Sequence, residues 1–204
     1  MLAPLPLPHV AVETSLGTIV LRIEAARAPI TAANFLKYVD SKRYDGQNFY
    51  RTTRNWGAGS TLVQAGVRSD ARLLYPAVAH ESTRATGLTH CPGAVSMARA
   101  APGSARSDFF LLLSAIPGFD ADPGAAGDNA GYAVFAEVVS GWSVAQAIAA
   151  APVSETSGDG VMKGQMLVAP VKIVRARRVP AIPAADPAKP LPGCAVKASP
   201  SPAQ

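Results

Sequence analysis

The chain has 204 residues, of which 49% are hydrophobic and 16% are charged, and its formal net charge is +5 at pH 7. This length and composition predict one globular domain with a sizeable core. No apolar run approaches the ~18 residues that a membrane-spanning helix needs. The arginines form no stripe with interleaved aromatics of the kind that binds nucleic acid, so neither a membrane nor a nucleic-acid partner is predicted.

The first residues, MLAPLPLPHV, contain three prolines, which exclude a helix there. They also lack the basic and long apolar regions of a signal peptide. Two alternatives stay open. The protein is cytoplasmic with its native start, or a start methionine replaces a targeting segment.

The first elements are a hairpin and a helix. In residues 10–24, apolar residues alternate with polar or small ones around a Ser-Leu-Gly turn, which predicts two strands. Residues 29–46 predict a helix with Thr31 as a candidate N-cap. Its apolar face at helical spacing consists of Ala32, Phe35, Leu36 and Val39.

Short apolar runs bounded by Gly, Pro or Ser follow, and their length and composition predict strands. These runs are residues 61–67, 93–98, 108–114 and 131–139, and a last strand is predicted over 166–179. Residues 141–153 predict a second helix that Pro152 ends. Its candidate cap is Ser143, and its candidate inward residues are Val144, Ala147 and Ile148. Many short strands with two helices predict a closed antiparallel barrel or a sandwich.

The remaining segments carry few signals. From Pro180 onward the chain is rich in Pro and Ala with almost no large apolar residues, which predicts a disordered or extended tail. Arg175, Arg177 and Arg178 are typical of a solvated strand end. The two cysteines, Cys91 and Cys194, form no metal pattern, and the sequence does not decide whether they form a disulfide.

The stretch NFYRTTRNWGAGSTLVQAGV (48–67) places Arg51 and Gln64 where a strand pattern favours apolar residues. Each residue alone fits an exposed strand position as well as a site. Together with other blocks they resemble the cyclophilin-type peptidyl-prolyl cis–trans isomerases in their bacterial form. The blocks span about residues 9–179 and read TSLGTIVLRIEAARAPITAANFLKYV, YDGQNFYRTTR, LVQAG, GAVSMARA, SDFFLLLS, GYAVFAEVVSGWSVAQAI and MKGQMLVAPVKI.

This resemblance implies a mainly β fold, an eight-stranded antiparallel β-barrel capped by two α-helices, with the proline site on its outer face. The domain would span residues 9–179, between an N-terminal extension (1–8) and the tail (180–204). The resemblance implies rotation about X–Pro bonds to assist protein folding, without a cofactor or metal. The implied partners are proline-containing polypeptides, the implied state is a monomer, and periplasmic localisation follows by family analogy.

The resemblance also implies the site residues. Arg51 matches the catalytic arginine, which donates to the prolyl nitrogen when the bond twists and thus acts in the transition state. The substrate-binding positions are Tyr50, Leu62, Gln64, Ala98, Arg99, Ala100, Asp108, Phe110, Phe119 and Tyr132. A strand's period of two then assigns Phe109 to the core and Phe110 to the cleft. His80, His90 and Cys91 suggest a metal, but no third ligand has sensible spacing.

Several departures from the family pattern bear on function. Tyr50 replaces a histidine, Asp108 replaces a glutamine, and Thr61 stands where a pocket phenylalanine is usual, after a longer loop. Trp56 in that loop is a candidate to refill the pocket, and Phe119 at the rim in place of a tryptophan predicts weak cyclosporin binding. Two alternatives therefore remain: a catalytically weak peptide-binding module or chaperone, and a structural barrel whose tail contacts other proteins.

Overall fold

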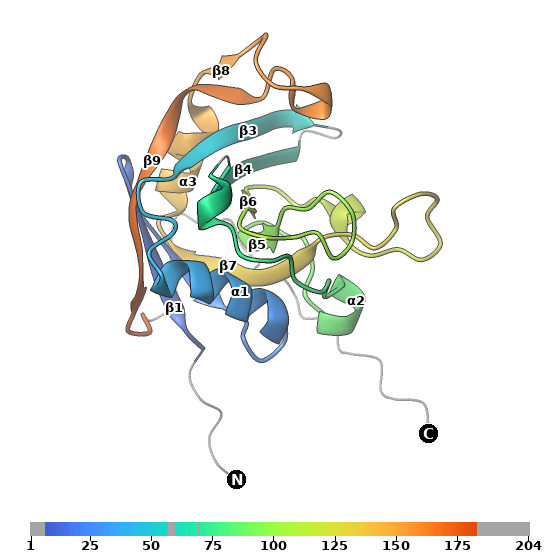
Figure 1. Cartoon of the computed structure of the whole chain (residues 1–204). Coiled ribbons are helices and arrows are strands. Elements are labelled where there is room, and N and C mark those ends of the chain that lie inside the picture. The colour runs from blue at the N-terminus through green and yellow to red at the C-terminus, as the bar shows by residue number, and fades with distance from the viewer. Residues whose placement is uncertain (1–6, 57–59, 69, 183–204) are drawn as a thin grey trace.

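The structure, a computed structural model, describes residues 7–56, 60–68 and 70–182 and contains a closed antiparallel β-barrel (Figure 1). Eight strands form the ring in the order β1, β2, β7, β5, β6, β4, β3, β9, and β1 pairs with β9 to close it. Their bounds are β1 (His9–Thr14), β2 (Gly17–Ile23), β3 (Asn48–Trp56), β4 (Ser60–Gly66), β5 (Ala94–Met97), β6 (Phe109–Leu112), β7 (Ala133–Ser140) and β9 (Met166–Val179). A short extra strand, β8 (Val153–Ser154), pairs with β9. The predicted eight-stranded barrel is confirmed.

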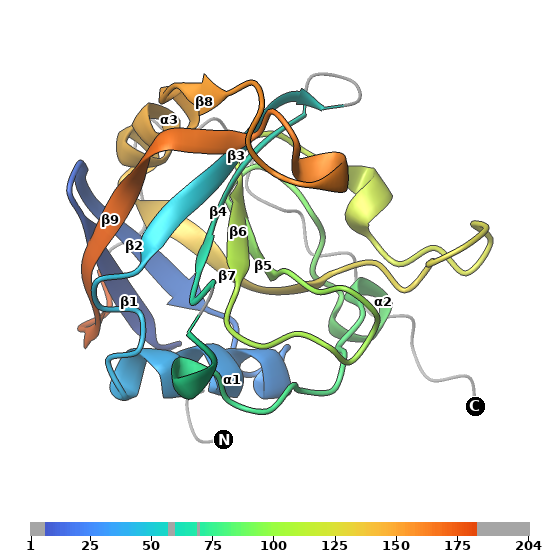
Figure 2. The same ribbon diagram turned by 45° about the horizontal axis from the view of Figure 1, so that its top comes forward.

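Two longer helices cover the barrel. Figure 2, turned from the first view, shows α1 (Pro29–Asp40) and α3 (Trp142–Ala150) at opposite ends of the ring of strands. A single-turn helix, α2 (Thr83–Thr86), and three 3-10 turns lie in the connecting loops. These turns are η1 (Ala71–Leu73), η2 (Pro117–Phe119) and η3 (Gly160–Met162).

The barrel core is built from alternate residues of the strands and from the apolar face of α1. In β2, Ile19, Leu21 and Ile23 are fully buried while the residues between them are not, as a period of two requires. Phe35 of α1 packs edge-on against Phe109 of β6, with ring centroids 5.4 Å apart. The predicted face of α1 is buried throughout.

Both predicted helix caps are wrong. Pro29 is in the first turn of α1 and Ala28 is the N-cap, so Thr31 lies inside the helix. The distant Glu81 carboxylate instead accepts the N–H bonds of Ile30 and Thr31, at 3.1 and 2.7 Å. Such a cap cannot be read from local sequence, because its acceptor lies 50 residues along the chain.

At α3 the N-cap is Gly141, not Ser143. Gly141 has φ +81°, and a Cβ there would overlap the Thr18 carbonyl oxygen of β2, so a side chain does not fit. The helix consequently begins one residue before Ser143, and Ala147, which was expected to face inward, is exposed. Ile148 is buried as predicted.

The arginine cluster of β9 is fully paired. Arg175, Arg177 and Arg178 bond the carboxylates of Glu13, Asp45 and Asp40 at 2.8, 2.7 and 2.7 Å. In the described part of the chain, no helix has the length and apolar character that crossing a membrane requires. The extension before residue 7 and the tail after residue 182 lie outside the described residues, so their predicted properties stay predictions.

Candidate active site

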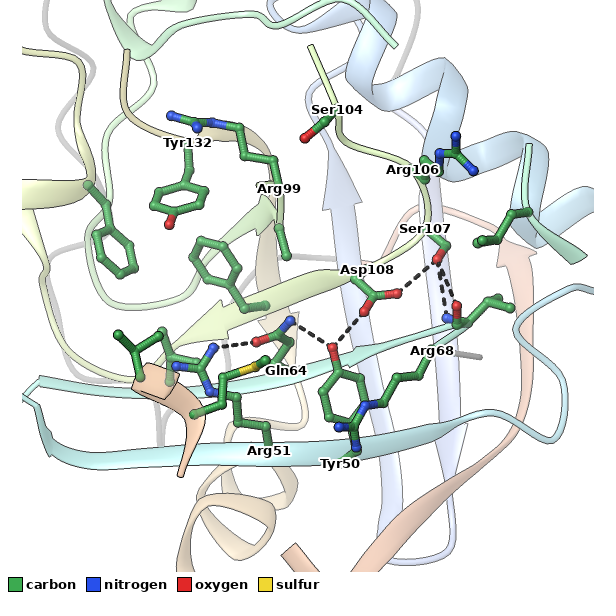
Figure 3. Close-up of a pocket in the computed structure, with 18 residues that line it drawn as sticks. Tyr50, Arg51, Gln64, Arg68, Arg99, Ser104, Arg106, Ser107, Asp108 and Tyr132 are labelled. Carbon is green, nitrogen blue, oxygen red and sulfur yellow. Dashed lines mark hydrogen bonds between the residues drawn. The ribbon is translucent and has the colours of Figure 1, made fainter. Parts of the chain in front are cut away.

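A cleft of about 670 Å³ lies on the outer face of β3, β4 and β6 and is enclosed by the loops around Arg68, Arg99 and Phe119 (Figure 3). All of the predicted site residues except Ala100 line it. Arg51, Gln64 and Phe110 stand opposite one another across three neighbouring strands, because Arg51 pairs with Gln64 and Gln64 with Phe110. They therefore share one face of the barrel wall, while Phe109 lies on the other face in the core.

A β-bulge in β3 adds a second residue to this face. The register between β3 and β4 shifts after Phe49, so Tyr50 is the extra residue between Phe49 and Arg51. Consecutive strand residues normally point to opposite faces, and a bulge removes that alternation locally. Tyr50 and Arg51 therefore both line the cleft, while Phe49 remains fully buried in the core.

The Arg51 guanidinium is fixed by neutral acceptors on two sides. Its Nη1 donates to Gln64 Oε1 at 2.7 Å. Its Nε and Nη2 donate to Gln165 Oε1 at 2.8 and 2.6 Å. Three of the five guanidinium N–H donors are thus used within the described chain, and the rest are available to a ligand. Among the described residues no carboxylate bonds this guanidinium, and burial lowers the Arg51 pKa without discharging it.

A buried polar chain continues from Gln64. Gln64 Nε2 donates to the Tyr50 hydroxyl at 2.7 Å, and that hydroxyl donates to Asp108 Oδ2 at 2.6 Å. The Ser107 hydroxyl donates to the other carboxylate oxygen at 2.8 Å. Burial raises the Asp108 pKa above its usual range, and the bonds from Tyr50 and Ser107 oppose that rise. Burial, together with the Asp108 charge, raises the pKa of Tyr50, which keeps its hydroxyl proton.

Three aromatic rings form the other wall of the cleft. The ring centroid of Phe110 lies 5.6 Å from that of Phe119 and 5.4 Å from that of Tyr132, and both contacts are nearly edge-on. The centroids of Phe119 and Tyr132 are 4.8 Å apart. Leu62 completes the apolar lining. The arrangement gives an apolar recess beside the Arg51 guanidinium, of a kind that accepts a compact apolar ring.

His90 supports this wall from behind. Its ring stacks on Phe110 at 6.2 Å and meets Phe119 edge-on at 5.7 Å. Asp120 bonds Nδ1 at 2.7 Å and Ser96 bonds Nε2 at 3.0 Å. These three residue types are those of a hydrolase triad, but Ser96 is 0% exposed and no substrate reaches it. The cluster is therefore structural, and burial lowers the His90 pKa.

The segment from Ala98 to Ala100 matches its prediction in part, because Ala98 and Arg99 line the cleft and Ala100 does not. The Arg99 side chain is only 3% exposed and bonds Asp128 at 2.5 Å and the Gly131 carbonyl. It thereby ties this segment to the loop before Tyr132 and lies over that ring, 5.0 Å from its centre. Ala100 is exposed outside the cleft and donates its N–H to Ser104 Oγ at 3.0 Å.

Two predictions concern the longer loop after Arg51. Thr61 does not line the cleft, and its N–H donates to Ser114 Oγ at 2.8 Å. The side chain of Trp56 lies outside the described residues, so its proposed place in the pocket stays a prediction. Of the residues weighed for a metal, His80 bonds the Ala130 carbonyl and Cys91 is disulfide-bonded. Cys194 is not among the described residues.

Sequence reasoning missed the loop residues of the cleft and the second partner of Arg51. The missed lining residues include Arg68, Arg106, Ser107, Val161 and Met162. They come from irregular segments, where no periodicity indicates which side chains face a shared cavity. Gln165 lies within the block MKGQMLVAPVKI but was not predicted as a site residue, although a polar residue directly before the apolar run of β9 was a usable signal.

Comparison with known proteins places this geometry in a family. Residues 9–178 match the family described as cyclophilin type peptidyl-prolyl cis-trans isomerase/CLD. The chain belongs to this family. This cyclophilin is 32% identical over 167 residues to a peptidyl-prolyl cis-trans isomerase of Acinetobacter baylyi, covering 81% of this chain and 82% of that relative. It is 35% identical over 152 residues to peptidyl-prolyl cis-trans isomerase A of Dickeya dadantii, covering 69% and 70%.

Solved structures agree on the fold. A cyclophilin type isomerase of Cryptosporidium parvum superposes on this cyclophilin with a TM-score of 0.67 at 16% identity, covering 86% of this chain and 99% of that one. A structure of that type in the presence of the dipeptide Ala-Pro gives a TM-score of 0.64 at 18% identity, with 83% and 97% covered. The family membership makes this cyclophilin a peptidyl-prolyl cis–trans isomerase.

Proposed function

We propose that the cleft binds a proline-containing polypeptide with the ring against Phe110 and the prolyl nitrogen facing Arg51. The observation that carries this proposal is the Arg51 guanidinium, which is charged, fixed by neutral acceptors and next to an apolar recess. Both requirements of an isomerase site, a grip on the ring and a donor at the nitrogen, are then met by one cavity. Exposed X–Pro segments of folding chains are the proposed substrates.

The chemistry needs no nucleophile and no proton transfer. Resonance in the peptide bond sets a barrier of ~18–20 kcal/mol, and an X–Pro bond turns in roughly tens to hundreds of seconds unaided. When the bond twists, the nitrogen regains its lone pair and becomes an acceptor. A donor aimed at that nitrogen therefore binds the transition state more tightly than the ground state, which lowers the barrier.

Arg51 alone does not supply the whole effect. Reaching the millisecond range takes about five decades, or ~7 kcal/mol at ~1.4 kcal/mol per decade. One hydrogen bond to a charged group contributes about 1.5–3 kcal/mol. The low-dielectric aromatic wall strengthens that bond. The rest is assigned to holding the residues beside proline still while the bond rotates, through Gln64 and the backbone near Arg99.

The test is the isomerisation rate of a short Ala-Pro-Phe peptide with wild type, Arg51→Ala and Arg54→Ala. Arg54 is the matched control, since it lies in the same strand but bonds the Ala149 carbonyl at 2.7 Å instead of facing the cleft. The expected result is that Arg51→Ala loses most of the acceleration and Arg54→Ala keeps it. If folded wild type binds the peptide without accelerating exchange, the protein is a peptide-binding module instead.

We also propose that the protein acts as a monomer. The closed ring supports this proposal, because pairing of β1 with β9 leaves, among the described strands, only the two-residue β8 with a free edge through which strands of two chains could join. The mass in solution, measured by light scattering across a range of concentrations, is expected to stay that of one chain. A mass that doubles with concentration would contradict it.

Weak binding of cyclosporin is proposed from the cleft rim. The prediction rests on Phe119, the aromatic residue of η2 that lies against Tyr132, in place of a tryptophan. The phenylalanine carries no indole N–H donor. In a calorimetric titration, Phe119→Trp is expected to bind the drug more tightly than wild type. Equal affinities would show that another residue occupies the rim position.

We propose an oxidising compartment such as the periplasm. The support is that Cys91 is disulfide-bonded, and disulfides persist in oxidising compartments and are rare in the cytosol. Free-thiol labelling of protein taken from its native cells, with and without reductant, is the measurement. Labelling of Cys91 without reductant would favour the cytoplasm.

A further inference from the structure

The hydrogen-bond chain that ends at Arg51 begins at Asp108, on the far side of the cleft floor. It runs from Asp108 through Tyr50 and Gln64 to the guanidinium, with donor–acceptor distances of 2.6, 2.7 and 2.7 Å (Figure 3). We propose that Asp108 is a positioning residue that, through Tyr50 and Gln64, fixes the orientation of Arg51. This inference rests on the proposed role of Arg51 in catalysis.

The hydrogen-bond chain runs in one direction because the carboxylate at one end can only accept and the guanidinium at the other end can only donate. The carboxylate of Asp108 only accepts hydrogen bonds, so the Tyr50 hydroxyl donates its single proton to Oδ2. The Tyr50 oxygen can then only accept from Gln64, which turns the Nε2 group of that amide toward it. Gln64 is left with Oε1 facing Arg51, whose guanidinium can only donate. Each bond thus determines the polarity of the next.

Reversing the chain would place two donors face to face. If the group at position 108 offered no acceptor, the Tyr50 hydroxyl would be free to donate to Gln64 instead. The Gln64 amide would then turn its Oε1 toward Tyr50 and its NH₂ group toward the Arg51 N–H, which is repulsive. Arg51 would keep only its bonds to Gln165, and its guanidinium could rotate.

Asp108 lines the cleft, but its carboxylate is held within the wall. Both of its carboxylate oxygens have partners within the protein, Tyr50 on one and Ser107 on the other. Its side chain lies directly against Gly66, where a Cβ would overlap the Asp108 carboxylate. Gly66 has φ +152°, so glycine meets both the conformation and the close approach. This packing leaves the carboxylate little freedom to turn toward a substrate.

The buried location gives the chain its effect. Tyr50 is 6% exposed and Gln64 is 7% exposed, so water does not compete strongly for their hydrogen bonds. A guanidinium that is free to rotate points at the prolyl nitrogen for only part of the time. Misplacement of a catalytic group on the scale of 1 Å costs about a hundredfold in rate, and a partial loss of orientation is expected to cost about tenfold.

The test compares two substitutions of similar shape that differ in one acceptor. Asp108→Asn keeps an oxygen toward Tyr50 and can donate to Ser107 Oγ, so kcat should stay within about threefold of wild type. Asp108→Leu removes the acceptor, and kcat should fall by about tenfold with KM little changed, because orientation is lost rather than substrate contact. Equal activity of both variants, or a loss confined to KM, would overturn the positioning role.

A double-mutant cycle tests whether the effect passes through Tyr50. Once Tyr50→Phe has removed the hydroxyl, replacing Asp108 with Leu should lower kcat by no more than about twofold further. Tyr38→Phe is the matched control, since its hydroxyl accepts from the Tyr75 N–H at 2.8 Å, outside the cleft. Additive losses in kcat for Tyr50→Phe and Asp108→Leu would contradict a shared chain.

The orientation of Arg51 can also be read without activity. In ¹⁵N NMR of the whole protein, slow rotation about the Nε–Cζ bond of Arg51 should give separate Nη signals, assigned by their loss in Arg51→Lys. These signals should persist in Asp108→Asn and merge in Asp108→Leu and Tyr50→Phe. Unchanged signals in all variants would refute the inference even if the enzyme is active. The expected changes in a protein without activity would instead refute the proposed function alone.

Discussion

Gln165 Oε1 accepts two hydrogen bonds from the Arg51 guanidinium, at 2.8 and 2.6 Å, on the side away from Gln64. The backbone of Gln165 is itself fixed to β3, since its carbonyl accepts the Thr52 N–H at 3.0 Å. The acceptor therefore moves with the strand that carries Arg51. This glutamine holds the guanidinium from the loop side, just as Gln64 holds it from the sheet.

Replacing Gln165 with Leu should lower kcat by about tenfold, because the guanidinium loses two of its three bonds within the protein and points at the prolyl nitrogen for only part of the time. The measurement is kcat and KM on an X–Pro peptide. Gln146→Leu is the control, since Gln146 is exposed on α3 away from the cleft. Equal rates for the two variants would show that Gln64 alone orients Arg51.

The neighbours Phe109 and Phe110 should separate stability from activity. Phe109 packs against Phe35, Tyr44 and Phe49 in the core, whereas Phe110 faces the cleft. Phe109→Leu is expected to cost about 1–2 kcal/mol of unfolding free energy and to leave kcat/KM unchanged. Phe110→Leu should raise KM, and it should lower the unfolding free energy less than Phe109→Leu does. Chemical denaturation and steady-state rates on both variants provide the comparison, and a reversed pattern would mean that the faces of β6 are misassigned.

The sequence predicted most of the strands, though not β3 and β8, because each of the predicted strands presents one face to a continuous core. Alternation in β2 and the uninterrupted run of β9 carry that signal locally, and the bounds of β9 agree with the predicted 166–179. The core and cleft faces of β6 followed from the same period of two. Features that depend on one strand and its neighbours were therefore predictable.

Features that depend on distant groups were not predictable. The N-terminus of α1 is satisfied by Glu81, and the start of α3 is set by contact between Gly141 and β2. The bulge that turns Tyr50 to the same side as Arg51 leaves no mark in composition. Its existence follows from pairing with β4, which a single strand's sequence does not contain. The second partner of Arg51 was missed for the same reason.

Charge around the cleft predicts a preference among substrates. Arg68 and Arg106 line it, and neither forms an ion pair within the described chain. Peptides with Glu or Asp close to proline should bind about twofold to fivefold more tightly than their Gln or Asn analogues, since exposed ion pairs contribute about 0.2–1 kcal/mol. The difference should shrink with added salt, because the screening length is about 10 Å at 0.1 M.

Titrations of matched peptides into wild type and Arg68→Ala/Arg106→Ala test this preference. The double variant should bind the acidic and neutral peptides alike. Arg72→Ala is the control, because Arg72 is exposed, lies outside the cleft and pairs with Asp70 at 2.9 Å. A preference that survives in the double variant would have to come from Arg51 or another group.

The His90 cluster predicts an acid-sensitive part of the stability. Burial lowers the His90 pKa below the ordinary 6.5, with Asp120 opposing the shift. The unfolded chain therefore binds a proton at a higher pH than the native state does, and unfolding free energy falls as pH drops below about 6.5 toward the native value. His90→Asn retains a donor for Asp120 but does not titrate. The substitution should lower the unfolding free energy by about 1–3 kcal/mol at pH 8, because Ser96 loses its hydrogen-bond partner.

That cost should shrink as the pH is lowered from 8 to 5, because only wild type loses the stability tied to neutral His90. Urea unfolding of both proteins at each pH gives the difference, which cancels the titration of groups that do not contact His90. His80→Asn serves as the matched control, since within the described chain His80 bonds only a backbone carbonyl, at 3.0 Å. A difference between wild type and His90→Asn that stays constant across this range would mean that His90 keeps an unshifted pKa. The cluster behind Phe110 would then support the aromatic wall by packing alone.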